Sequence, residues 1–283
     1  MSDTYNIQGP LVDVDWLRDN FNKANVKIVE AKMKPVNAPD NWETGFKIPG
    51  AVQMDINADF SILETDLPHM FPDAALFSKS AQKLGLHNED VLVVYDQVGT
   101  YGSPRAWWMF RAMGHEKVYV LNGGLPAWQK AEMPLEKAEW PKAIEGDFVA
   151  QINKALWKTA DEVLSEIGNE NSQILDARAQ GRFDGTAPEP RPDLRGGHIP
   201  GSFCLPFQQV QDGIYMKSEA QLKAIFSALN LGEKSLIMSC GSGVTASVLA
   251  LAAEVAGYKN AAVYDGSWAE WGMPNEKYPV EKA

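Results

Sequence analysis

The two halves of this chain repeat one another, and no other feature of the sequence constrains its fold as strongly. An Ile-Pro-Gly sequence occurs once in each half, at 48–50 and at 199–201. Three further positions recur at one constant offset of 143 residues, as the pairs Gly114 and Gly257, Gly123 and Gly266, and Trp128 and Trp271. Because several matches in one register are improbable by chance, the sequence predicts two domains that share one fold.

Within each half, short apolar runs alternate with longer periodic segments. The runs at 91–95 and 235–239 have the composition of buried parallel strands. Each is followed by a loop and then by an apolar-periodic segment that predicts a helix, at 103–113 and at 244–256. Further strands are predicted at 26–30, 117–121, 172–176 and 261–264. This order predicts an α/β fold in which each domain has a mostly parallel sheet flanked by helices.

The length of the chain fits this division. With 283 residues, 45% of them hydrophobic and 22% charged, the chain is large enough for two globular domains. We place the domains at 1–141 and 159–283. The segment 142–158 lacks a strong period and is predicted to link them.

Composition also narrows the partners and the compartment. No run approaches the roughly 20 apolar residues that span a bilayer, and the net charge of -11 argues against nucleic acid or an anionic membrane surface as the main partner. The segment 1–5 has neither the basic nor the apolar region of a signal peptide. Two cysteines are too few for a disulfide framework, and with four scattered histidines they give no pattern of a metal site. We therefore expect a cytoplasmic protein without a metal.

The chemistry of the chain is concentrated in the loop after the strand at 235–239. Cys240 stands at the end of that strand, and Gly241 and Gly243 allow the backbone N–H groups of the loop to turn inward as an anion-binding nest. The helix expected from 244 presents unpaired N–H groups and the positive end of its dipole at the same point. A thiolate and a bound oxyanion are both stabilised there, so we expect Cys240 to be a nucleophile. Apolar residues flank Cys204, which is predicted to be structural.

With these features the whole chain resembles the tandem-rhodanese sulfurtransferases, and the loop resembles the form found in members that use 3-mercaptopyruvate. The strand at 91–95 ends at Asp96, where the second half has Cys240, which implies a first domain without catalytic activity. The resemblance implies a persulfide on Cys240 and catalytic assistance from Ser242. It assigns substrate binding in this loop to Gly241, Gly243, Val244 and Thr245.

The two positions after the cysteine distinguish the sulfur donors within this family. Members that use thiosulfate typically carry Arg and Lys there, whereas this chain has Gly241 and Ser242. The resemblance therefore implies 3-mercaptopyruvate as the donor. Cysteine-dependent phosphatases, some of which share this fold, need an Arg six positions after the cysteine. This chain has Ala246 there, which argues against phosphoryl transfer.

A segment rich in arginine can supply the positive charge that an anionic substrate needs on an acidic protein. Three prolines within 178–195 predict a semi-rigid loop rather than a helix. In the mercaptopyruvate enzymes, arginines of Gly-Arg-Phe and Glu-Pro-Arg segments hold the substrate carboxylate, which implies this role for Arg182 and Arg191. The alternative is ion pairing at the surface, which we favour for Arg178 and Arg195; the carboxylates available for it are Asp184, Glu189 and Asp193.

A second catalytic group is implied from the first half of the chain. In the family, a His of a His-Met segment partners the serine two residues after the cysteine, which corresponds here to His69 and Ser242. The alternative is an ordinary loop histidine. The family's upstream acid falls at Asn57, and an amide cannot act as a carboxylate. Either Asp55 or Asp59 replaces it, or the relay is shorter here.

These predictions combine into a two-step cycle without an organic cofactor. Cys240 takes sulfur from a small anionic donor, 3-mercaptopyruvate, and pyruvate leaves; a thiol such as thioredoxin, or cyanide, then removes the sulfur. Three alternatives stay open: thiosulfate as the donor, a binding module that has kept the fold without turnover, and an oxidant-sensing thiol.

Overall fold

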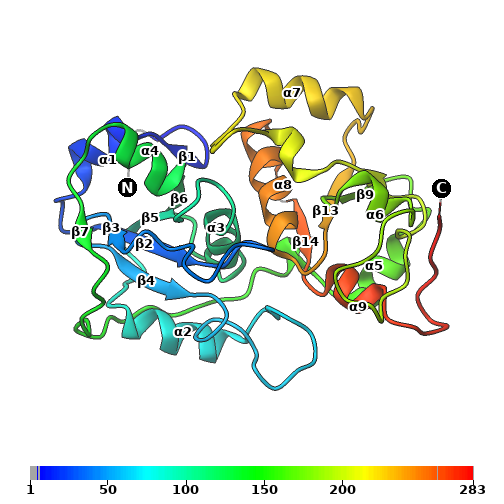
Figure 1. Cartoon of the computed structure of the whole chain (residues 1–283), viewed down its shortest axis with the longest axis horizontal. Coiled ribbons are helices and arrows are strands. Elements are labelled where there is room, and N and C mark those ends of the chain that lie inside the picture. The colour runs from blue at the N-terminus through cyan, green and yellow to red at the C-terminus, as the bar shows by residue number, and fades with distance from the viewer. Residues whose placement is uncertain (1–4, 6, 260, 283) are drawn as a thin grey trace. The chain divides into compact units, whose positions relative to one another are not determined.

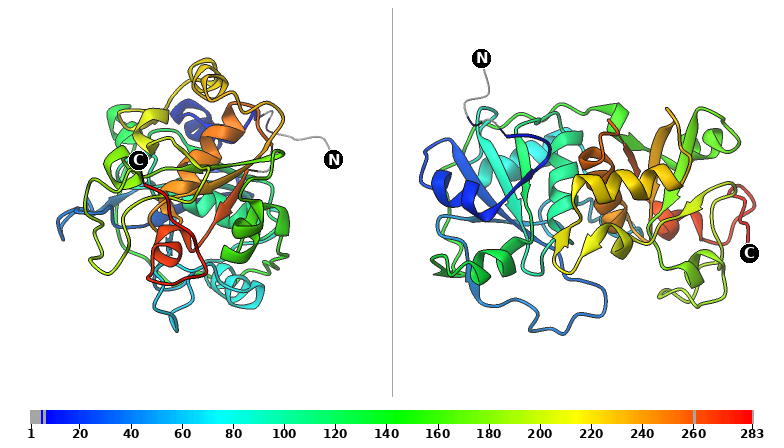
Figure 2. Two further views of the ribbon diagram at one scale, coloured as in Figure 1. Left: turned by 90° about the vertical axis from the view of Figure 1, so that its right-hand side faces the viewer. Right: turned by 90° about the horizontal axis from the view of Figure 1, so that it is seen from above.

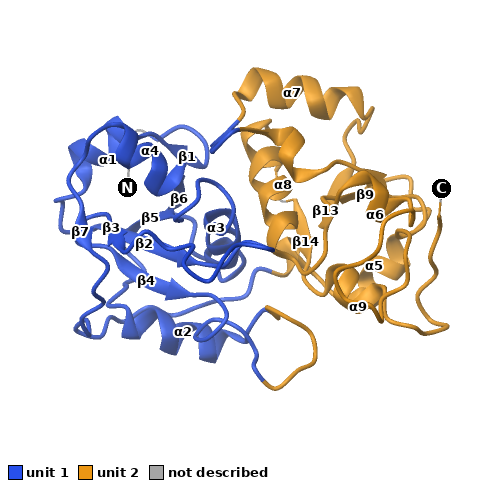
Figure 3. Cartoon of the chain, viewed as in Figure 1, with its two compact units in different colours: residues 1–63, 71–153, 213–216 blue, residues 64–70, 154–212, 217–283 orange. Residues whose placement is uncertain are grey.

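A computed structural model of the chain describes residues 5, 7–259 and 261–282 and divides it into two compact units. The first unit comprises 1–63, 71–153 and 213–216, and the second comprises 64–70, 154–212 and 217–283 (Figure 3). The signal-peptide prediction concerns residues 1–5, of which 1–4 lie outside the described residues. Each unit is described by itself.

The first unit is built on a five-stranded sheet in which all neighbouring strands are parallel (Figure 1). Its strands, in the order in which they lie side by side, are β1 (Leu11–Val12), β6 (Val118–Leu121), β5 (Val91–Tyr95), β2 (Val26–Lys32) and β4 (Val52–Asp55). Its helices are α1 (Val14–Asn20), α2 (Ala74–Lys83), α3 (Ser103–Ala112) and α4 (Gly124–Lys130). Two short strands, β3 (Phe46–Lys47) and β7 (Glu136–Lys137), form a separate antiparallel pair.

The second unit repeats this sheet strand for strand. Its parallel strands, in order, are β8 (Trp157–Lys158), β14 (Ala262–Tyr264), β13 (Ser235–Ser239), β9 (Ser172–Asp176) and β10 (Phe203–Cys204). Its helices are α5 (Ala160–Glu166), α6 (Gln180–Phe183), α7 (Glu219–Ala228), α8 (Val244–Val255) and α9 (Ser267–Trp271). Two 3-10 turns, η1 (Lys154–Leu156) and η2 (Phe207–Val210), also belong to this unit. The remaining described strands, β11 (Gln211–Asp212) and β12 (Tyr215–Met216), form a two-stranded pair, in which β12 belongs to the segment 213–216 of the first unit.

The predicted fold class, two α/β domains with parallel sheets flanked by helices, is confirmed. All five residues of β5 and of β9 are buried, and helices lie on both sides of each sheet (Figures 1 and 2). Two elements, η1 and β8, lie inside the segment 142–158 that we predicted as a linker. No helix among the described residues is long and apolar enough to cross a membrane.

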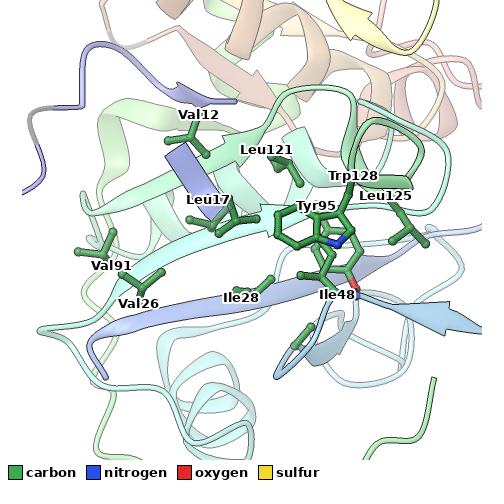
Figure 4. Packing of buried hydrophobic residues seen from close by; sticks show 12 residues of the cluster. Val12, Leu17, Val26, Ile28, Ile48, Val91, Tyr95, Leu121, Leu125 and Trp128 are labelled. Carbon is green, nitrogen blue, oxygen red and sulfur yellow. The ribbon is translucent and has the colours of Figure 1, made fainter. Parts of the chain in front are cut away.

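The repeated residues hold equivalent places in the two units. Trp128 and Trp271 are fully buried in the hydrophobic cores of their units, as Figure 4 shows for Trp128. Each donates its indole N–H to the carbonyl oxygen of a proline at 2.7 Å, Pro134 in the first unit and Pro279 in the second. A buried indole N–H needs an acceptor. In each unit, the repeated tryptophan therefore binds the segment that follows its helix, α4 or α9.

Candidate active site

Cys240 lies where the sequence predicts it, directly after β13 and four residues before the start of α8. Its side chain is buried, with 1% of the residue exposed. Gly243, at the N-cap of α8, has a left-handed backbone (φ +77°) and, being a glycine, provides no side-chain cap hydrogen bond to the helix. The first turn of a helix carries backbone N–H groups without intrahelical acceptors, and anions commonly bind at such a place.

Within the loop, Ser242 directs its backbone N–H at the sulfur, with the nitrogen 3.4 Å from Sγ of Cys240. An N–H donor aimed at the sulfur stabilises negative charge on it. The loop is also tied to α9, because the N–H of Trp268 donates to the carbonyl of Cys240 at 2.9 Å and the N–H of Ala269 to that of Gly241 at 2.8 Å. Cys240 and Gly241 are thus held through their backbone carbonyl groups.

Ser267, which the sequence did not point to, lies beside Cys240. Its Oγ accepts the N–H of Cys240 at 3.1 Å, donates to the carbonyl of Tyr264 at 2.7 Å and lies 4.0 Å from Sγ. Its backbone is left-handed (φ +47°), and the equivalent position of the first unit is Gly124 (φ +55°). In the sequence, the only signal is that Ser267 replaces Gly124 in the repeat; the structure adds that this serine adopts a conformation that favours glycine.

Arg182 is the predicted substrate-binding arginine that the structure brings to the loop. It lies on α6, and a Cβ built on Gly241 would be 3.3 Å from its Nη2 and 3.8 Å from its Nη1. Its Nε and Nη2 donate to Oε2 of Glu189 at 3.1 and 2.6 Å. The guanidinium group therefore has one edge on Glu189, and its two terminal nitrogens lie against Gly241.

The remaining predictions about this segment need correction. The segment 178–195 is not a loop throughout, since α6 forms one helical turn within it, ahead of the first proline. Arg178 does pair with Glu189, but the pair is buried rather than at the surface. Arg195 donates to backbone carbonyl oxygens instead of carboxylates, namely those of Trp271, Gly272, Asn275 and Tyr278. Both arginines therefore have structural roles.

For the other candidate residues, the structure gives the exposure, the backbone conformation or an ion-pair partner. Arg191 is exposed, and its side chain forms no hydrogen bond or ion pair with the residues that the structure describes. His69 is half-buried with a left-handed backbone (φ +59°), in the segment 64–70 that belongs to the second unit. Asn57 is exposed, and Asp55 is paired with Lys32 at 3.2 Å.

Cys204 is half-buried on the edge strand β10, where its Sγ lies 3.5 Å from the carbonyl oxygen of Arg178. Burial, together with the charge of Asp176, raises the pKa of the Cys204 thiol to about 12. This thiol is neutral at physiological pH and is a poor nucleophile. Among the residues that the structure describes, no group of three or more His, Cys, Asp or Glu side chains is arranged to hold a metal ion.

The first unit shows what this type of loop binds. Asp96, which stands where the second unit has Cys240, is 1% exposed, and its carboxylate accepts six hydrogen bonds of 2.7–2.9 Å. Five come from backbone N–H groups and one from a hydroxyl; the donors are Val98, Gly99, Tyr101, Gly102 and Ser103. The N–H groups of the loop between strand and helix therefore surround an anion, which in this unit is the carboxylate of Asp96 itself.

Comparison with known proteins agrees with this architecture. The sequence model of the rhodanese-like domain matches the chain twice, at residues 13–131 and 159–273. The chain belongs to the rhodanese-like domain family. The two matches correspond to the two halves of the repeat, and Cys240 lies within the second rhodanese-like domain.

Individual relatives match over nearly the whole chain. The chain is 39% identical to the 3-mercaptopyruvate sulfurtransferase of Escherichia coli (strain K12), with 95% of this chain and 97% of that protein covered. It is 38% identical to the protein named thiosulfate/3-mercaptopyruvate sulfurtransferase 1, mitochondrial, of Arabidopsis thaliana, covering 96% of this chain and 78% of the relative. The crystal structure of SseA from Escherichia coli, described as a 3-mercaptopyruvate sulfotransferase with the rhodanese fold, superposes with a TM-score of 0.81 at 36% identity and covers 93% of this chain and all of that one.

Proposed function

We propose that this protein is a 3-mercaptopyruvate sulfurtransferase that carries sulfur on Cys240 as a persulfide. One observation carries the proposal: a buried cysteine lies in a loop where the backbone N–H of Ser242 faces its sulfur, with the terminal nitrogens of Arg182 against the same loop. The names of relatives that are 38 and 39% identical over nearly the whole chain support the same reaction.

In the first step, the Cys240 thiolate attacks the sulfur of 3-mercaptopyruvate. The S–S bond of the persulfide forms, the C–S bond of the donor breaks, and its electron pair passes to carbon as the enolate of pyruvate. A proton then converts the enolate to pyruvate, which leaves. The loop N–H groups and the Ser242 hydroxyl stabilise the negative charge, and Arg182 binds the donor carboxylate. Arg191, which is exposed in the structure, is the second carboxylate ligand that the family resemblance implies.

In the second step, an acceptor thiolate attacks the outer sulfur of the persulfide and restores the Cys240 thiolate. We propose a thiol acceptor such as thioredoxin in the cell, and cyanide serves in an assay. His69 is assigned to proton transfer with Ser242, on the basis of the resemblance and of its place in the second unit. Both steps balance without a metal or an organic cofactor.

The remaining assignments concern the organisation of the chain. We propose a first domain at 1–141 that is catalytically inactive, a linker at 142–158 and a catalytic domain at 159–283. The first domain lacks the cysteine, and the carboxylate of Asp96 already fills the loop at that position. We further propose that the protein acts in the cytoplasm, on a small anionic donor rather than on nucleic acid or a membrane.

Thiosulfate is the second candidate donor, because the name of the Arabidopsis relative includes it. The structure favours mercaptopyruvate. Nη2 of Arg182 lies 3.3 Å from the Cβ that any other residue would carry at Gly241, so a cationic side chain there would meet an arginine. The positive charge near the loop therefore comes from Arg182 on α6 and not from a side chain of the loop itself.

The test compares donors in steady-state assays of the native protein and of Cys240→Ser, with cyanide as the acceptor. We expect kcat/KM for 3-mercaptopyruvate to exceed that for thiosulfate and expect no turnover by Cys240→Ser. A preference for thiosulfate would contradict the donor assignment. The absence of turnover with both donors would favour a binding module, and oxidation of Cys240 by peroxide without sulfur transfer would favour an oxidant sensor.

A further inference from the structure

We propose that Glu189 is a positioning residue that aims Arg182 at the carboxylate of the sulfur donor. The inference deepens the proposed function, on which it rests, by adding a residue that acts through Arg182 rather than by touching the donor. Glu189 stands two residues before the predicted ligand Arg191, and from the sequence alone it offered no more than a surface ion pair.

The two carboxylate oxygens of Glu189 serve two different arginines. Oε1 accepts from Nη1 of Arg178 at 2.9 Å, and Oε2 accepts from Nη2 of Arg182 at 2.6 Å and from its Nε at 3.1 Å. The Glu189 side chain is only 1% exposed, as is that of Arg178, whereas that of Arg182 is 26% exposed. Glu189 thus connects a buried arginine to a partly exposed one.

The buried arginine gives Glu189 a fixed point. Arg178 also donates to both carboxylate oxygens of Asp176 and to the carbonyl of Gly197, and its guanidinium group stacks 4.1 Å from the centre of the Trp268 ring. Trp268 in turn donates its backbone N–H to the carbonyl of Cys240. Arg178 and Trp268 therefore connect Glu189 to the loop that carries Cys240.

This arrangement leaves a defined part of Arg182 for a ligand. Because Nε and one N–H of Nη2 are bound to Glu189, the remaining N–H groups belong to Nη1 and Nη2, the two atoms nearest Gly241. These two nitrogens form the fork that binds a carboxylate in bidentate fashion. A guanidinium group held in place loses less conformational freedom when the donor binds.

Positioning and simple charge make opposite predictions for Glu189→Gln. Removing the carboxylate makes the site more positive, so an effect of charge alone would strengthen the binding of an anion. Loss of positioning would weaken it, because Arg182 would lose both of its bonds to a carboxylate and become mobile. The sign of the change therefore separates the two.

The experiment measures the alkylation rate of Cys240 by iodoacetate and by iodoacetamide, with the modified peptide followed by mass spectrometry. The two reagents differ in one carboxylate, so the ratio of their rates reports carboxylate recognition at this cysteine and cancels general changes in its reactivity. We expect Glu189→Gln to lower the ratio of the iodoacetate rate to the iodoacetamide rate by about 3- to 10-fold, the cost of immobilising one long side chain on binding.

Asp184→Asn is the matched control, because it removes one negative charge at the C-terminus of the same helix. Its carboxylate accepts from Gln180 at 2.8 Å, whereas the side-chain bonds of Arg182 go to Glu189. The ratio should stay the same or rise in this variant. Glu189→Asp keeps the charge but is too short to span both arginines, and it should also lower the ratio; it serves as the test if Glu189→Gln does not fold.

A ratio that is unchanged or higher in Glu189→Gln, or unchanged in Glu189→Asp where Glu189→Gln does not fold, would overturn the inference. Alkylation needs no sulfur donor, so its outcome is independent of whether 3-mercaptopyruvate is the substrate. If the protein turns over 3-mercaptopyruvate, Glu189→Gln should raise KM by a similar factor and leave kcat nearly unchanged, because positioning acts on binding of the carboxylate.

Discussion

The carboxylate of Asp96 should be one of the main stabilising groups of the first domain. Oδ1 accepts from the N–H groups of Val98 and Gly99 at 2.9 and 2.7 Å, and Oδ2 accepts the other four hydrogen bonds. In Asp96→Asn, the amide oxygen can face only one of these two sets. The better choice keeps the four bonds on the Oδ2 side and leaves two N–H donors facing an NH2 group.

The magnitude follows from these two donors. A buried donor without an acceptor costs about 1–3 kcal/mol, so two of them cost about 4 kcal/mol. For a domain of this size, that loss lowers the unfolding temperature by about 10–15 °C. Scanning calorimetry can follow the first domain as a transition of its own, since multidomain proteins need not unfold in one step.

Two further variants make the result specific to anion binding. Asp73, the exposed N-cap of α2, accepts the N–H of Leu76, and Asp73→Asn should change stability little because Asn caps a helix as well as Asp does. Asp96→Ala leaves room for a small carboxylate, so formate should raise its unfolding temperature more than that of the native protein. Unchanged stability of Asp96→Asn, or no selective effect of formate, would refute the account of this loop.

Two more predictions concern titrating groups outside the Cys240 loop. Because the pKa of its thiol is raised to about 12, Cys204 should remain unmodified by iodoacetamide at pH 8 in the native protein. Peptide mass spectrometry should find the label on Cys240. Rapid labelling of Cys204 would contradict this prediction. Burial lowers the pKa of His115 to about 4. Below pH 6.5 the unfolded chain therefore binds a proton at this histidine that the folded protein does not bind. The free energy of unfolding should fall by about 3 kcal/mol between pH 6.5 and 4. Urea unfolding of His115→Phe should show a shallower loss between pH 7 and 5, whereas equal slopes would refute this assignment.

The elements of the fold could be predicted because their signals are local. The strands and helices expected at 91–95, 235–239, 103–113 and 244–256 are present within one residue, since apolar runs of strand length and helical periodicity both lie in contiguous sequence. Strands β1, β8 and β10 were not predicted. Each is an edge strand of only two residues, which is too short for a period to appear.

The site could be predicted only in part. Cys240 and its loop were found because a strand end, paired glycines and a helix start are consecutive in sequence. The different roles of Arg178 and Arg182 were not, because the burial of one and the partial exposure of the other depend on how α6 packs. Ser267 lies 27 residues beyond Cys240 and reaches it only through the pairing of β13 with β14.

The most direct test of the account is to mix the reduced protein with one equivalent of 3-mercaptopyruvate in the absence of an acceptor. We predict that one pyruvate is released per protein and that the peptide containing Cys240 gains one sulfur atom, with neither in Cys240→Ser. Pyruvate release without sulfur on Cys240, or sulfur found on Cys204 instead, would contradict the persulfide mechanism.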